Sequence, residues 1–343
     1  MQSSVSIPTK KRDQSIDILR FIGIALIILA HTFPPDTILN LRCFDVSLML
    51  FVSGLTLSKR KYDFSLSYFK HRTIRLLLPV YFFLKIYFIL AFTCQSIGFD
   101  FGINSNHVIG SYLLQDRIGF VWIIRGFLLI ALVTPFILFL KEKTNTAWMF
   151  SISLLLVLLI DALITNGVGM QNLFVRDYLY YAIGYSVPFI VGLVLPNLNL
   201  KQLWIVLFGT LALLIIKGLL ILNPASEEFS PTSLLIFNNF KYPPNSYYIL
   251  YGVLMSTLCY IILVKFETYR YLLLFEFIGC NTIWIYLYHI PLIQITGKLS
   301  LGWPIRYLMV FVIAFLLTYL QVKLITKLQK KYIWASRLQF LKG

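Results

Sequence analysis

Long apolar stretches, separated by short polar segments, follow one another along the whole chain. A transmembrane helix needs about 20 mostly apolar residues. Stretches of this kind predict ten spans, at residues 16–34, 43–58, 74–97, 118–140, 146–164, 178–196, 202–222, 246–264, 277–296 and 304–324. Since no repeat and no long linker divides them, the pattern predicts one all-α, polytopic membrane domain at residues 16–325, between basic tails at 1–15 and 326–343.

Composition narrows the class of protein further. Hydrophobic residues make up 59% of the chain and charged residues 13%, against about 45–50% and about 25% in soluble proteins. A nucleic-acid-binding protein with a net charge of +16 would carry that charge on a wet surface and would be far less apolar. We therefore expect the lipid bilayer, and no nucleic acid, as a partner.

The positions of the basic residues predict an orientation. With the N-terminus in the cytoplasm, 20 basic residues fall in cytoplasmic segments and six on the opposite side, while Arg20, Lys85, Arg125 and Lys217 lie within spans. Lys and Arg gather on the cytoplasmic side of membrane proteins, so this bias predicts that both termini are cytoplasmic. The four cysteines lack metal-binding spacing, and no metal site is expected.

Arg20 and His31 are the most informative ionisable residues, because both fall within the first predicted span. Eleven residues at about 100° each make three turns plus about 20°, which puts both side chains on one face, about 16 Å apart along the axis. Alone, each residue is more typical of a membrane interface. Together on one face they favour a functional site, with Asp17 one turn away as a partner for Arg20.

Two polar motifs flank the loop between the second and third predicted spans. Arg72 and Arg75 would be neighbours on a helix and would form a clamp of two guanidinium groups suited to phosphate. Anchoring at the cytoplasmic membrane edge explains them equally well. Ser53 and Gly54, near the end of the second span, are also consistent with a face where two helices pack closely.

Three further residues lie toward the outer half of the bilayer. Trp122 stands one turn before Arg125 at the start of the fourth span, a pair typical either of an interfacial belt or of a polar wall that stacks on a sugar. His289 lies in the ninth span, where a lone histidine is more often a structural residue than a base. With Arg20, Arg72 and Arg75 toward the cytoplasm, and His31, Arg125 and His289 toward the outside, this arrangement suits group transfer across a membrane.

In these residues the sequence resembles the acyltransferase-3 family of integral-membrane O-acyltransferases, over about residues 15–325. Arg20 followed by ten residues and His31 is similar to the family's Arg-x10-His signature. The aromatic Ser-Gly stretch at 50–54, the Arg-rich loop at 69–79, Gly119-x-x-Trp122 and the block at 278–291 are similar to other family motifs. Phe21, where members often have Gly, and Asp45, out of register, depart from the pattern.

The resemblance implies an acyl-CoA donor, most often acetyl-CoA, and no bound cofactor. It implies a hydroxyl of a cell-surface or lipid-linked polysaccharide as acceptor, and the bacterial cytoplasmic (inner) membrane as the location. The catalytic residues would be His31, as general base, and Arg20. Donor binding would fall to Arg72, Arg75, Ser53 and Gly54, and acceptor binding to Trp122, Arg125 and His289.

A second function also fits the chain. Ten spans with buried charges are consistent with a polysaccharide exporter or flippase that has no acyl-transfer activity. The sequence lacks the paired, Gly/Pro-broken helices in two matching halves that are expected of an inverted-repeat transporter. Acyl transfer is therefore the first interpretation and transport the alternative.

Overall fold

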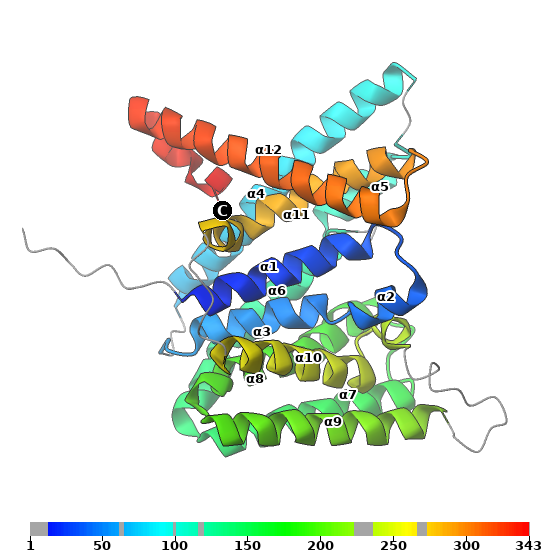
Figure 1. Ribbon diagram of the computed structural model, residues 1–343, viewed down its shortest axis with the longest axis vertical. Coiled ribbons are helices and arrows are strands. Elements are labelled where there is room, and N and C mark those ends of the chain that lie inside the picture. The colour runs from blue at the N-terminus through cyan, green and yellow to red at the C-terminus, as the bar shows by residue number, and fades with distance from the viewer. Residues whose placement is uncertain are drawn as a thin grey trace, which may run out of the picture.

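The computed structural model describes residues 13–61, 65–98, 101–115, 120–222, 236–265 and 273–342, and their regular structure is helical throughout (Figure 1). The α-helices are α1 (Gln14–Ala30), α2 (Asp36–Leu41), α3 (Asp45–Leu57), α4 (Leu66–Ser96), α5 (Ser105–Tyr112), α6 (Trp122–Lys143), α7 (Thr146–Thr165), α8 (Tyr180–Val194), α9 (Leu200–Leu222), α10 (Ser246–Lys265), α11 (Leu273–Gly297) and α12 (Trp303–Lys331). Short helical turns are η1 (Val175–Leu179), η2 (Leu195–Asn197), η4 (Phe237–Phe240) and η5 (Ile333–Lys342). The predicted all-α class is confirmed.

Each of the ten predicted spans overlaps one α-helix, and these helices range from 13 residues in α3 to 31 residues in α4. In the described part of the chain, eight helical segments are long and apolar enough to cross a membrane, and α1 and α11 are not among them. The helix α1 has 17 residues, and α11 has a non-helical residue, Asn281, in its interior. A multi-pass membrane protein is therefore shown, while the count of ten spans and the cytoplasmic placement of the termini stay predictions.

Local sequence signals fix where several helices begin. Asp13 accepts a hydrogen bond from the backbone N–H of Ser15 and caps α1, as Ser65 caps α4 through the N–H of Tyr68. Such caps satisfy backbone donors that have no partner within the helix. The helix α12 runs on into the predicted C-terminal tail, and η5 folds back so that the Trp284 indole donates to the carbonyl of Phe340.

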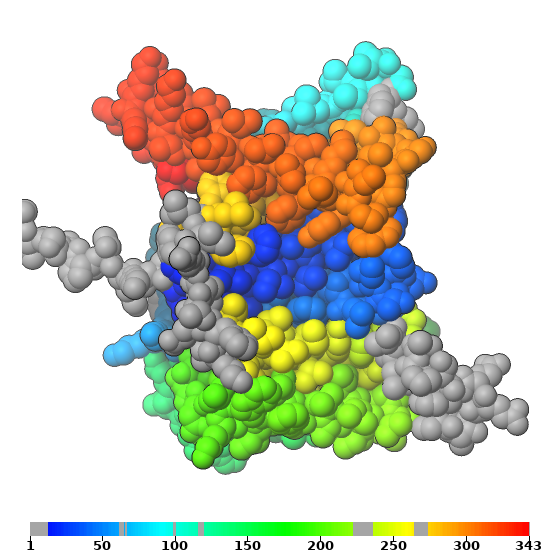
Figure 2. Space-filling model, in the orientation of Figure 1, coloured from blue at the N-terminus to red at the C-terminus, as the bar shows by residue number. Residues whose placement is uncertain are grey.

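The helices lie side by side as a stack in which α1 occupies the middle, between α3 and α11 (Figure 1). On one side α3 packs on α8, and α9 and α7 form the outer edge; on the other side α11 packs on α12. In the space-filling view, α4 and α12 project beyond the rest of the stack at opposite ends of the same edge (Figure 2). The start of α1 and the end of α12 lie toward one end of the molecule, which we call the Arg20 end; the opposite end is the His31 end.

Candidate active site

A cavity of about 470 Å³ lies between α1, α3, α4, α6, α8 and α11. On α1 it is lined by Arg20, Ile24 and Ile27, and the next residue in this i, i+4, i+7, i+11 series is His31. The face predicted from the spacing of Arg20 and His31 is thus the face that borders the cavity. His31 itself follows the last turn of α1 as its C-cap residue.

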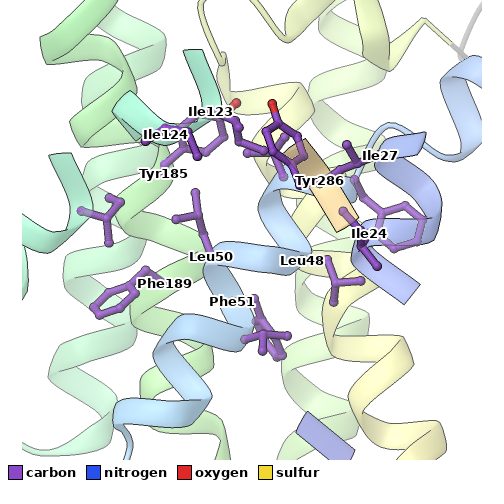
Figure 3. Packing of buried hydrophobic residues seen from close by; sticks show 14 of the residues in the cluster. Ile24, Ile27, Leu48, Leu50, Phe51, Ile123, Ile124, Tyr185, Phe189 and Tyr286 are labelled. Atoms are coloured by element: carbon purple, nitrogen blue, oxygen red, sulfur yellow. The ribbon is translucent and has the colours of Figure 1, made fainter. Parts of the chain in front are cut away.

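The cavity is polar at one end and apolar along its length. Its polar end holds the guanidinium groups of Arg20, Arg72 and Arg75, with the hydroxyls of Ser53 and Thr56 nearby. Most of the remaining wall is apolar and includes Val52, Ile123, Ile124, Phe127, Ile130, Phe189 and Ile283. Figure 3 shows Tyr286 between Ile123 of α6 and Ile27 of α1 in this wall.

Hydrogen bonds to Asp17, Gly279 and Thr56 help to hold Arg20 in place. Its guanidinium donates to the Asp17 carboxylate at 3.5 Å, to the Gly279 carbonyl at 3.3 Å and to the Thr56 hydroxyl at 3.2 Å. Gly279 lets this contact form, because a Cβ there would lie 2.4 Å from Oδ1 of Asp17. The partner that the sequence predicted for Arg20 is confirmed.

Arg72 and Arg75 differ from Arg20 in having no such partners. Both line the cavity, and neither guanidinium forms a hydrogen bond or an ion pair with any residue that the structure describes. Arg75 is exposed and Arg72 half-buried, with its Nε buried and unpaired. Two fixed positive charges are therefore available to a ligand at the Arg20 end.

At the other end, His31 pairs with His289 of α11. Nδ1 of His31 lies 3.0 Å from Nε2 of His289, and Nδ1 of His289 is hydrogen-bonded to the carbonyl of Tyr286. A carbonyl oxygen only accepts, so Nδ1 of a neutral His289 carries the proton and its Nε2 accepts from Nδ1–H of His31. This chain of two hydrogen bonds leaves Nε2 of His31 with a free lone pair, the form that a general base requires.

Two residues that the sequence analysis missed connect the histidine pair to the cavity. The Phe120 ring meets His31 edge-on, with ring centroids 4.7 Å apart, and meets His289 at 5.6 Å. Tyr286, one turn before His289 on α11, lines the cavity and donates its hydroxyl proton to the carbonyl of Phe120. Tyr286 could have been found from its i,i+3 relation to His289, whereas nothing in the sequence distinguishes Phe120.

Trp122 and Arg125, predicted to bind the acceptor, lie outside the cavity lining. Both side chains are buried. The guanidinium of Arg125 lies over the rings of Tyr178 and Tyr181, at 5.1 Å and 5.3 Å from their centroids. Trp122 meets Tyr181 edge-on at 5.8 Å, so the two residues share one aromatic neighbour.

A buried ion cluster adjoins this aromatic group. The Asp45 carboxylate accepts from Arg42 at 2.5 Å and from the Lys241 ammonium at 2.9 Å. Lys241 lies 5.9 Å from the centroid of the Trp122 ring. Burial lowers the pKa of Lys241, and the charge of Asp45 acts in the opposite direction. From the sequence, Asp45 stands out only as a departure from the family pattern, and Arg42 and Lys241 have no assigned role. The contact of Asp45 with Lys241 joins residues 196 positions apart, whereas Arg42 and Asp45 are one helical turn apart.

Ser53 and Gly54 have different surroundings. Ser53 lines the cavity, with its hydroxyl donating to the carbonyl of Met49 at 3.0 Å. Gly54 faces α8 instead, where an added Cβ would lie 2.1 Å from the carbonyl oxygen of Phe189. This is the close helix packing that was the alternative interpretation of Ser53 and Gly54. Gly54 does not line the cavity, and its role in donor binding stays a prediction. The described residues include no group of three or more His, Cys, Asp or Glu that could hold a metal ion.

Comparison with known proteins identifies the family. The acyltransferase-3 family model, which describes an acyltransferase domain, matches residues 13–322 and so covers most of the chain. A search of curated proteins and a search of solved structures found no match. The matched segment contains every residue of the cavity and of the histidine pair. The chain therefore belongs to the acyltransferase-3 family, and its apolar helices make it a multi-pass membrane acyltransferase.

Proposed function

We propose that the protein is an O-acyltransferase that moves an acetyl group from cytoplasmic acetyl-CoA to a hydroxyl of a cell-surface or lipid-linked polysaccharide. The observation that carries the proposal is the cavity between the two ends of α1. It begins at three arginines and ends at Ile27 and Tyr286, each one turn before a member of the histidine pair. The cavity thus runs from the proposed seat for phosphate to within one helical turn of the proposed base.

The polar end of the cavity suits the phosphates of acetyl-CoA. Guanidinium groups bind phosphate through paired, charge-assisted hydrogen bonds, and Arg72 and Arg75 have no competing partner among the described residues. The uncharged arm of the donor would then lie along Ile24, Ile27, Ile123 and the neighbouring apolar wall. The rise of eleven helical residues, about 16 Å, is the distance that this arm must bridge to reach His31.

The chemistry follows from the proton positions at the histidine pair. Nε2 of His31 accepts the proton of the acceptor hydroxyl while the hydroxyl oxygen attacks the thioester carbonyl carbon. The tetrahedral intermediate collapses as the C–S bond breaks, and the thiolate of CoA takes the proton back from His31. The products are an acetate ester and free CoA, so His31 is regenerated in each cycle.

His289 acts in this scheme as a positioning residue. Its hydrogen bond fixes the His31 ring and keeps the proton on Nδ1, so that Nε2 faces the reaction with its lone pair. When His31 becomes positively charged, the same bond stabilises it, since Nε2 of His289 still accepts. The negative oxygen of the intermediate would be stabilised by a backbone N–H at the His31 end, because Ser53 lies with the arginines at the opposite end and its hydroxyl donates to the carbonyl of Met49.

The proposal is tested by NMR of the surface polysaccharide from a deletion strain that expresses each variant. We expect His31→Ala and Arg20→Ala to abolish the O-acetyl signals while the protein still inserts into the membrane. His107, which caps α5 through Asn104 and lies outside the cavity lining, provides the matched control, and His107→Ala should leave the signals in place. Normal O-acetylation with His31→Ala would refute the assignment of His31.

A further inference from the structure

The buried cations at the His31 end outnumber the carboxylates that neutralise them. Arg42, Lys241 and Arg125 are 5%, 3% and 5% exposed, and Asp45 is 2% exposed. Asp45 pairs with Arg42 and Lys241, whereas Arg125 has no ion pair with any described residue. The nearest acidic side chain along η1, Asp177, is bonded to Arg176 at 2.9 Å. Two positive charges thus remain without a counter-charge in the described part of the chain.

An excess of buried positive charge costs free energy in a membrane protein. A buried charge in a membrane-spanning segment is normally paired, and unpaired ones mark sites where a ligand or ion is handled. The Nε atoms of Arg42 and Arg125 are buried and have no hydrogen-bond partner among the residues that the structure describes. The faces of Tyr178 and Tyr181 attract the Arg125 guanidinium, but they leave its N–H donors unsatisfied.

The unbalanced cations are joined to one another and to the catalytic pair. Arg125 and Trp122 share the Tyr181 ring, and Lys241 lies against Trp122. Two residues before Trp122, the Phe120 ring contacts His31. Arg42 and Lys241 both lie within electrostatic range of His31. The cluster therefore borders the histidine pair on a side of α6 that does not line the cavity.

We propose that this cluster, made of Arg42, Lys241 and Arg125 with the Trp122 ring, binds an acidic group of the acceptor glycan, a carboxylate or a phosphate. The inference rests on the proposed function, because it names the chemistry of the acceptor that His31 activates. Guanidinium and ammonium donors satisfy both kinds of anion, and the Trp122 ring, packed against Lys241 and Tyr181, holds the cations of this cluster together. The ring of Tyr242, which is 53% exposed, meets Trp122 edge-on at 5.1 Å and so links the cluster to the surface.

The test compares the binding of sugars that differ in charge to the purified protein in neutral detergent, without acetyl-CoA. The probes are 4-nitrophenyl glucuronide, 4-nitrophenyl glucoside and glucose 1-phosphate, which differ in the presence and the type of acid. We expect at least one acidic probe to bind about tenfold more tightly than the glucoside. The stronger of the two identifies the anion as carboxylate or phosphate.

The key variant is Arg125→Gln, because Arg125 has no ionic partner that its removal would leave unpaired. We expect it to remove most of the preference for the acidic probe, and Lys201→Gln, which removes an exposed charge at the Arg20 end, to leave the preference intact. If Arg125→Gln does not fold, as judged by its elution and thermal unfolding, Lys241→Met replaces it with the same expectation. Equal binding of all probes, no binding of any, or a preference that survives in the variants would overturn the inference.

Thioester turnover with acetyl-CoA, measured on the same preparations, separates this result from the proposed function. Absent turnover in the wild type contradicts acyl transfer, whatever the sugars do. Normal turnover together with equal binding of the acidic and neutral sugars contradicts only the proposed binding of an acidic group.

Discussion

At the scale of single residues, the pairing of His31 with His289 determines which nitrogen of His31 carries a proton and which one has a free lone pair. The two rings come from positions 258 residues apart and share one hydrogen bond of 3.0 Å. The carbonyl of Tyr286 accepts a hydrogen bond from Nδ1 of His289. This bond fixes one proton on Nδ1 of His289 and leaves its Nε2 to accept the proton on Nδ1 of His31. Contact of His289 with the acceptor stays a prediction, while its hydrogen bonds to His31 and to the carbonyl of Tyr286 support the proposal that it orients the base.

This role predicts a specific kinetic effect for His289→Ala. Without its partner the His31 ring loses its orientation, and misplacement of a catalytic group by about 1 Å costs on the order of 100-fold in rate. We expect kcat for acetyl transfer to fall by about that factor, with little change in KM for acetyl-CoA. His289→Gln, whose amide oxygen also accepts from Nδ1–H, should recover part of the loss. An unchanged kcat with a raised KM for the acceptor would show that His289 binds the acceptor instead.

Arg72 is predicted to recognise the phosphates of the donor. A hydrogen bond to a charged group contributes about 1.5–3 kcal/mol, which corresponds to roughly 10- to 100-fold in affinity. We expect Arg72→Ala to raise KM for acetyl-CoA by that factor and to leave KM for acetyl-pantetheine, which has no phosphate, unchanged. Lys70→Ala removes an exposed charge from the same helix outside the cavity lining and should change neither value. An equal effect of Arg72→Ala on both donors would contradict phosphate recognition.

At the scale of helices, the close approach of α3 and α8 holds one wall of the cavity. Added Cβ atoms at Gly54 and Gly192 would lie 2.1 Å and 2.0 Å from backbone oxygens of the facing helix. Small residues at such positions let two membrane helices approach closely. The backbone oxygen of Phe189 lies against Gly54, and Phe189 also lines the cavity. The close packing of α3 on α8 therefore positions part of the proposed donor passage.

Gly54→Ala is therefore predicted to destabilise the fold. Backbone must move to admit the methyl group, and overpacking of this kind costs about 1–3 kcal/mol. Thermal unfolding in detergent should show a lowered Tm. Gly209→Ala on α9, where an added Cβ meets nothing within 4 Å, should leave Tm unchanged or slightly raised. An unchanged Tm with a raised KM for acetyl-CoA would instead support donor binding by Gly54.

Features within one helix could be predicted from the sequence, whereas contacts between helices could not. Helix positions follow from the lengths of apolar stretches, and the shared face of Arg20 and His31 follows from helical periodicity, because both are local properties. The partner of His31 and the ion pair between Asp45 and Lys241 join residues about 260 and about 200 positions apart. Such contacts depend on which helices become neighbours, and nothing in a single sequence specifies that.

At the scale of the whole molecule, the two ends carry different chemistry. The Arg20 end presents Arg72 and Arg75 to the cavity, and the His31 end holds the histidine pair beside the buried cations. A donor that stays in the cytoplasm and an acceptor on the other side of the bilayer need this separation. The central position of α1 connects the two ends through one continuous helix.

This polarity predicts how the chain is oriented in the membrane. Lys143, at the end of α6, and Asn166, after the end of α7, are exposed at opposite ends of the helix that separates them. In a background without native cysteines, we expect a membrane-impermeant maleimide to label Asn166→Cys on intact cells. Lys143→Cys should be labelled only after the cells are permeabilised. The reverse pattern would place the Arg20 end outside and would contradict a cytoplasmic donor.

The most direct test of acyl transfer uses purified protein, radiolabelled acetyl-CoA and a glycan extract from a deletion strain. The measurement is the label that becomes attached to glycan and is released by mild base, as an acetate ester would be. We predict incorporation by the wild type and by His107→Ala, and a loss of about 100-fold or more in His31→Ala, because general base catalysis contributes about 10²- to 10⁴-fold. Equal incorporation by the wild type and His31→Ala, or none by either, would contradict the account.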